Sequence, residues 1–159
     1  MKYLLFTAFF VQVAFLSPKY HIKRVWLFSR TQYAGNVPVL RGGQQPSGYT
    51  TTLVCFLEVS RGEKTPEWQS AWFRGNKYQV SMSHATQDSV AVGTKKNTDD
   101  MALAKAGPGC KLVELTLTLT GKDSVKREGE FVLEGTFNKQ PARLRSDEAA
   151  VELSAPLMP

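Results

Sequence analysis

The sequence predicts a mainly β protein, an antiparallel β-sandwich or an open barrel that carries one or two short helices. Three observations lead to this prediction. Residues 112–120 alternate between apolar and polar side chains, which is typical of a strand with one wet face. Residues 49–60 are rich in β-branched and aromatic side chains, which strands favour. Turn residues separate about seven such segments at the short spacing found in sandwiches and barrels.

The strand over residues 49–60 is apolar on both faces at its centre. We therefore expect it to be a central strand. The segment 130–137 alternates like 112–120, and a polar stretch at 121–129 joins the two. This arrangement predicts a hairpin between them. Shorter strands are expected at residues 24–29, 77–83 and 89–94, and residues 149–154 fit either a strand or a short helix.

Two segments begin like helices. Thr65 is a good N-cap, Pro66 fits a first turn, and Glu67 suits the positive end of a helix dipole. Gly75 would end this helix. Residues 98–106 repeat the pattern, with a threonine and two aspartates at the start and a Gly-Pro stop after the end, so a second short helix is expected there.

The first seventeen residues resemble a targeting segment. Lys2 is followed by 15 residues without a charge, as in a secretory signal. As a helix this run is about 22 Å long, shorter than the bilayer core of about 30 Å. A small-residue cleavage site is absent, so an uncleaved anchor, an interfacial helix or a buried first element of the domain stay open. We expect a signal or membrane-targeting segment at 1–17, a basic, turn-rich region at 18–48 and one β domain at 49–156.

Positive charge is concentrated at the start of the chain. Residues 1–57 hold 6 basic and no acidic side chains, whereas the remaining residues hold 14 of each. Such a stretch favours lipid headgroups or nucleic-acid phosphates, although basic residues also commonly flank an exported segment. The candidate basic patch comprises Lys19, Lys23, Arg24, Lys122, Lys126 and Arg127; its loop members equally fit solubilising turn charges.

Cys55 and Cys110 are the only two cysteines. With an export-like start, an even count predicts one disulfide, worth about 4 kcal/mol on the chain-entropy model. Two buried, reduced thiols are the alternative. The chain has only two histidines and no Cys-x-x-Cys pair, so we expect no metal site.

No catalytic or cofactor motif is present. The sequence lacks the glycine-rich nucleotide loops and the nucleophile elbow, so we expect neither catalytic residues nor a cofactor. The best binding candidates are aromatic side chains with an adjacent arginine, types that anchor interfaces. The same aromatic residues could instead fill the core. The candidate binding set is Trp68, Trp72, Phe73, Arg74 and Tyr78.

These observations favour a non-catalytic, exported binding module of the inhibitor, immunity or adhesion type, located in the periplasm or outside the cell. Its expected partner is another protein. A membrane partner through residues 1–24 is an alternative, and nucleic acid is a weaker one. Two further hypotheses are a self-assembling coat or appendage subunit with a basic N-terminal arm, and a small enzyme whose carboxylates converge only in three dimensions.

Overall fold

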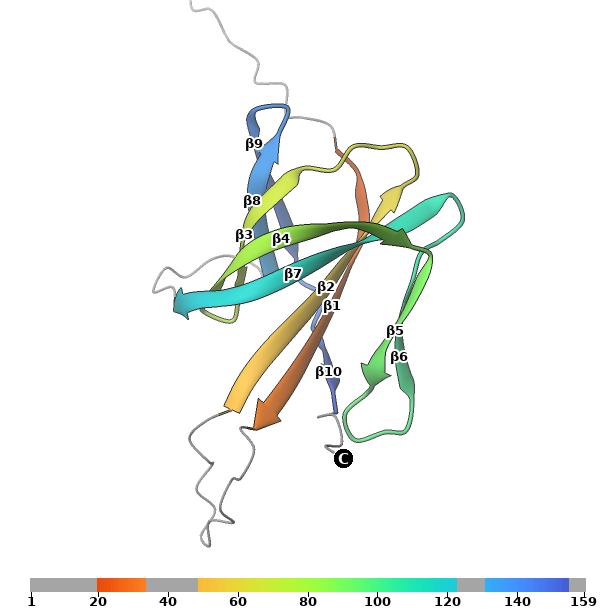
Figure 1. Ribbon diagram of the computed structural model, residues 1–159, viewed down its shortest axis with the longest axis vertical. Coiled ribbons are helices and arrows are strands. Elements are labelled where there is room, and N and C mark those ends of the chain that lie inside the picture. The colour runs from red at the N-terminus through yellow and green to blue at the C-terminus, as the bar shows by residue number, and fades with distance from the viewer. Residues whose placement is uncertain (1–19, 34–48, 123–130, 155–159) are drawn as a thin grey trace, which may run out of the picture.

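The computed structural model describes residues 20–33, 49–122 and 131–154. Every regular element within these ranges is a β-strand (Figure 1), which confirms the predicted mainly β class. The strands are β1 (Ile22–Tyr33), β2 (Tyr49–Ser60), β3 (Glu67–Phe73), β4 (Asn76–Gln87), β5 (Ser89–Thr94), β6 (Met101–Lys105), β7 (Cys110–Lys122), β8 (Phe131–Phe137), β9 (Gln140–Ser146) and β10 (Val151–Leu153).

Eight strands form one curled sheet in the order β10-β1-β2-β7-β4-β3-β8-β9, and β5 and β6 form a separate hairpin. All neighbours are antiparallel except β10 and β1, which are parallel. The sheet curls until Tyr20, just before β1, reaches β9. The Tyr20 hydroxyl donates to the Arg143 carbonyl at 2.5 Å and accepts from the Arg143 N–H at 3.0 Å. This contact draws the two ends of the open barrel together.

Large aromatic and aliphatic side chains fill the concave side of the sheet, which we call the interior. Trp68, Phe73, Tyr78 and Phe131 belong to this core, and all four are at most 3% exposed. The ring of Tyr20 meets that of Trp68 edge-on, with 5.8 Å between the ring centroids. Burying aromatic surface of this size supplies much of the stability of such a domain.

The hairpin β5–β6 covers the opposite face of β1, β2 and β7. Phe28, Phe56 and Leu112 project from that face and pack against Ala102 and Ala104 of β6. The two alanines are at most 1% exposed, and their small side chains let the hairpin lie close to the sheet. We call β5, β6 and the strand faces beneath them the hairpin layer.

The short strand β10 links the hairpin layer to the large sheet. Its Glu152 carbonyl accepts from the Lys96 N–H, and the Ser154 N–H donates to the Thr94 carbonyl, both at 2.9 Å. On its other side β10 pairs with β1. The segment 149–154, for which the sequence fitted either a strand or a short helix, therefore contains a strand at Val151–Leu153, and this strand joins the two sheets.

Both predicted helices are wrong, because both segments are strands. In β3, a bulge between Trp68 and Ser70 and a tight turn at Arg74 and Gly75 replace the expected helix and its end. In β6, the exposed Met101 and the buried Ala102 begin a strict alternation. The capping signals were real local preferences, but pairing with neighbouring strands outweighed them.

The predicted hairpin between residues 112–120 and 130–137 is also wrong. These segments are β7 and β8, and β4 and β3 lie between them in the sheet. Strand β7 pairs with β2 and β4, whereas β8 pairs with β3 and β9. The prediction that residues 49–60 form a central strand is confirmed, since β2 lies between β1 and β7.

Strand β1 extends the domain toward the N-terminus. Its Val25 and Leu27 are buried in the interior, and it pairs with β2 along nearly its whole length. The β domain thus includes residues 22–33, which the sequence analysis had assigned to a separate basic region. The predicted targeting segment at 1–17 lies outside the described residues. The described part of the chain holds no helix long and apolar enough to cross a membrane.

The predicted disulfide is absent, because both cysteines are free. Cys55 opposes Leu115, whereas Cys110 opposes Ser60, five positions further along β2. At about 3.3 Å per residue the two lie about 17 Å apart along the strand, and a disulfide needs about 4.4–6.8 Å between Cα atoms. Cys55 also faces the interior, where burial raises the pKa of its thiol.

Candidate functional site

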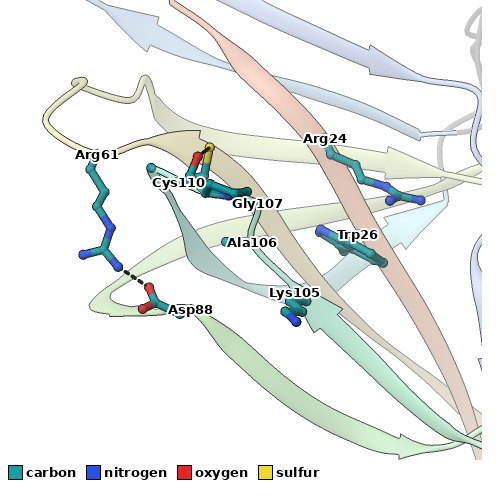
Figure 2. Close-up of a pocket in the computed structure, with 10 residues that line it drawn as sticks. Arg24, Trp26, Arg61, Asp88, Lys105, Ala106, Gly107 and Cys110 are labelled. Atoms are coloured by element: carbon teal, nitrogen blue, oxygen red, sulfur yellow. Dashed lines mark hydrogen bonds and ion pairs between the residues drawn. The ribbon is translucent and has the colours of Figure 1, made fainter.

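A pocket of about 560 Å³ opens beside the hairpin layer (Figure 2). This volume lies in the range of small-ligand sites. Three cationic side chains line it, namely Arg24, Arg61 and Lys105, and Asp88 is its one acidic lining residue. We call this the basic pocket. Its remaining lining is Trp26 and the segment from Ala106 to Cys110.

The three cations come from three parts of the fold by simple local rules. Arg24 follows a bulge in β1 and lies two residues before Trp26, so both project to the same face of the strand. Arg61 begins the turn after β2, where Gly62 has a positive φ of 84°. Lys105 ends β6. The chain then turns through residues 106–109 into β7.

The turn between β6 and β7 is fixed to β2. The carboxylate of Glu58, which is only 9% exposed, accepts a hydrogen bond from the Gly107 N–H at 2.9 Å. The Gly109 carbonyl accepts from the Arg61 N–H at 2.9 Å. Because Gly109 has a φ of 71°, this position favours glycine. The pocket wall is therefore held in place by the adjacent strand.

Arg24 and Trp26 form one end of the pocket. The Arg24 guanidinium lies over the Trp26 ring at 4.0 Å from its centroid, a cation–π contact. Arg24 also approaches Glu148 at 3.8 Å, and both side chains are at least half exposed. At the other end, Figure 2 shows Arg61 reaching toward Asp88, with which it forms an exposed ion pair.

Cys110 lines the pocket, and Lys23 lies near Cys110. The Cys110 thiol is 3.6 Å from the Pro108 carbonyl. A hydrogen bond and a charge interaction with Cys110 raise the pKa of the Lys23 ammonium, and the charges of Glu58 and Glu63 add to this shift. Lys23 is protonated at neutral pH, as lysines ordinarily are, and its charge adds to the positive potential near the pocket.

The aromatic candidates from the sequence lie mainly inside the protein. Trp68, Trp72, Phe73 and Tyr78 are at most 7% exposed, so a partner at the surface meets little of them. Arg74 lies at the exposed turn between β3 and β4. Its guanidinium is 4.8 Å from the centroid of the Phe73 ring.

The predicted basic patch is divided. Lys23 and Arg24 lie near the start of β7, where Cys110 is, and Lys122 lies at its other end. Cys110 and Lys122 are twelve positions apart along β7, a distance of about 40 Å. Lys19, Lys126 and Arg127 lie outside the described residues. Arg24 alone joins the basic pocket, and sequence reasoning missed Arg61, Asp88 and Lys105, because no spacing in the chain brings them together.

The three cationic side chains of the basic pocket are suited to binding an anion.

Within the described ranges, no group of three or more His, Cys, Asp or Glu side chains could hold a metal ion. The side chain of His84 lies outside the description, and His21 is exposed. Comparison with known proteins gives no match to any family model, curated protein or solved structure.

Proposed function

We propose that this protein is a non-catalytic binding module that holds an acidic side chain of a partner protein in the basic pocket. The carrying observation is the lining, which combines three cations and one carboxylate with the Trp26 ring. Guanidinium groups bind carboxylates through paired hydrogen bonds, and a lysine adds a point charge. The Trp26 ring supplies an apolar wall for the alkyl part of the ligand.

The cations of the pocket can exchange their present partners at little cost. Arg61 and Asp88 are 59% and 72% exposed, and Arg24 and Glu148 are 50% and 59% exposed. Exposed ion pairs of this kind contribute only about 0–1 kcal/mol each. An incoming carboxylate can therefore replace Asp88 or Glu148 as the partner of an arginine.

The shape of the charged surface favours a protein partner over nucleic acid. Nucleic-acid binding needs a stripe of basic residues that follows the phosphate backbone. Across the described strands, the predicted basic residues are separated by about 40 Å instead, and the cations that do meet surround one pocket. A single pocket of this size suits one or two acidic side chains.

Export to the periplasm or cell exterior is part of the proposal and is supported only by the apolar run at residues 1–17 and its flanking lysine. Cys55 and Cys110 are free thiols, so a disulfide no longer supports export.

The test is isothermal titration calorimetry with a hexaglutamate peptide at low salt. We expect Lys105→Glu to weaken binding about tenfold, equivalent to about 1.4 kcal/mol. Lys122→Glu makes the same charge change at the far end of β7 and is the matched control, expected to bind like the wild type. Affinity should fall as salt screens the charges.

Equal losses in the two variants would show general attraction to a basic protein and would overturn the proposal. Tighter binding of a single-stranded oligonucleotide or an anionic lipid vesicle, with the same loss in Lys105→Glu, would also overturn it in favour of that partner.

A further inference from the structure

Strand β6 has one edge that pairs with no described strand. On its other side it pairs with β5. The Ala106 N–H donates to the Asp88 carbonyl, and the Lys95 N–H donates to the Asp100 carbonyl, both at 2.9 Å. Residues of an antiparallel strand alternate between bonding their neighbour and pointing away from it. From both ends, this alternation directs the backbone groups of Met101, Leu103 and Lys105 to the open edge.

The same three residues also present their side chains to solvent. Met101 is 53% and Leu103 is 50% exposed, and Lys105 is exposed as well. The alternate residues Ala102 and Ala104 are buried against the sheet. The open edge of β6 therefore combines unpaired backbone donors and acceptors with two large apolar side chains.

The other terminal strand, β9, is protected by contrast. It carries Pro141, Arg143 and Arg145, and proline and charged residues at an edge discourage added strands. The Tyr20 hydroxyl bonds both backbone groups of Arg143. Strand β6 has none of these devices at its centre, where an exposed apolar edge is a template for another strand.

We propose that β6 pairs antiparallel with β6 of a second copy of this chain, with Leu103 on the twofold axis. In this register Met101 opposes Lys105 of the partner subunit, and Leu103 opposes the partner's Leu103. The three outward-pointing residues of each copy then face one another, giving about six backbone hydrogen bonds. Full overlap of β6 selects this register.

Charge complementarity favours a second copy as the occupant. The exposed Asp99 precedes β6, and Lys105 ends it. Antiparallel pairing brings the acidic end of one strand to the basic end of the other. Asp99, in the bend before β6, then lies at the end of the interface where Lys105 of the partner subunit lies, and opposite charges on adjacent strands attract.

One short strand per copy buries less surface than the roughly 1,200 Å² of a stable interface, so we expect weak, reversible association. Sedimentation velocity of the full chain from about 10 μM to about 1 mM covers the range in which such interfaces form. We expect the average mass to rise from monomer toward dimer. A strict monomer throughout this range would overturn the proposal, and so would larger open-ended assemblies.

Leu103→Pro is the sharpest variant. It removes the backbone donor on the twofold axis, and this N–H does not bond β5, so the hairpin can tolerate proline at its edge. Leu103→Lys places two like charges on the axis. Either change should abolish the dimer at all concentrations. Leu119→Lys, at an equally exposed leucine on β7 (52%), is the matched control and should dimerise like the wild type.

Amide exchange supplies a second measurement that does not depend on the variants. The N–H groups of Met101, Leu103 and Lys105 should become more protected as concentration rises, whereas that of Leu119 should not change. Unchanged exchange at Leu103 in a dimeric sample would place the interface elsewhere and contradict the proposal. The result is independent of the proposed ligand, because Leu103→Pro changes neither the lining of the basic pocket nor its charge and should bind hexaglutamate like the wild-type monomer.

Discussion

The interior and the hairpin layer cover opposite faces of the same three strands, β1, β2 and β7, yet their composition differs sharply. The interior is packed with large rings such as those of Trp68 and Phe131, and Tyr20 closes it toward β9. The hairpin layer is held by alanines against Phe28 and Phe56. It ends in the basic pocket and leaves one edge of β6 open.

This difference suggests that the interior mainly stabilises the fold, whereas the hairpin layer mainly forms the binding surface. Large buried rings give the interior most of the apolar surface that leaves water on folding. The hairpin contributes less buried surface, but it brings Lys105 and the turn at residues 106–109 to Arg24 and Arg61. Substitutions in the interior should therefore change the free energy of unfolding, and substitutions at the outer side of the hairpin layer should change binding.

The largest expected effect is on the interior side. Phe131 is fully buried, so Phe131→Ala leaves a cavity and should lower the free energy of unfolding by about 3–5 kcal/mol. Urea unfolding followed by fluorescence measures this. Leu119→Ala is the control at an exposed position and should change it by less than about 0.5 kcal/mol. Similar losses in both variants would contradict the assignment of the interior as the main core.

A second interior prediction concerns the bulge in β3. A Cβ on Gly135 would clash with the Glu67 carbonyl oxygen, so Gly135→Ala forces the paired strands apart. We expect a loss of about 1–3 kcal/mol in the free energy of unfolding. Gly121 has open space around its Cβ position, so Gly121→Ala is the matched control. Equal unfolding curves for Gly135→Ala and the wild type would show that the bulge does not bring the backbones this close.

The smallest effect is expected where β10 ties the hairpin layer to the sheet. Lys96 donates a hydrogen bond to Glu152 at 2.9 Å, and this bond, with the lysine charge, lowers the pKa of the Glu152 carboxyl. The stabilisation is present above the ordinary value of 4.5 and is lost as pH falls through the lowered pKa. Glu152→Gln should thus lower the Tm slightly at neutral pH and leave it unchanged in strong acid. A constant difference at all pH values would contradict this role.

The sequence predicted the strands whose alternation is strong, and it failed where tertiary pairing decides. The pattern around Leu115 and Leu117 identified β7 because the face opposite the interior is exposed from Thr116 onward. Residues 101–105 are good helix formers, but their alternation of large and small side chains fits a strand that lies flat on Phe56 and Leu112. Strand order could not be predicted, because β7 and β8 are neighbours in sequence but not in the sheet.

The candidate site was less predictable than the fold. Arg61 follows β2, Asp88 joins β4 to β5, and Lys105 ends β6, so only the folded topology brings them together. The Gly-Pro pair after Ala106 was predicted to stop a helix that does not form. It lies instead in the turn from β6 to β7, and nothing in its sequence indicated that this turn would form a pocket wall. The even cysteine count predicted a disulfide that does not form. The count failed because it contains no information on strand register or on the face from which each cysteine projects.

The most direct test of the proposed function is an NMR titration of the full chain with hexaglutamate at low salt, below the concentration at which β6 edges would associate. We predict that the indole N–H signal of Trp26 and the backbone amides of residues 105–110 shift most, while signals from the far end of β7 near Lys122 stay in place. Shifts that are largest near Lys122, or spread evenly over all exposed lysines and arginines, would contradict the account.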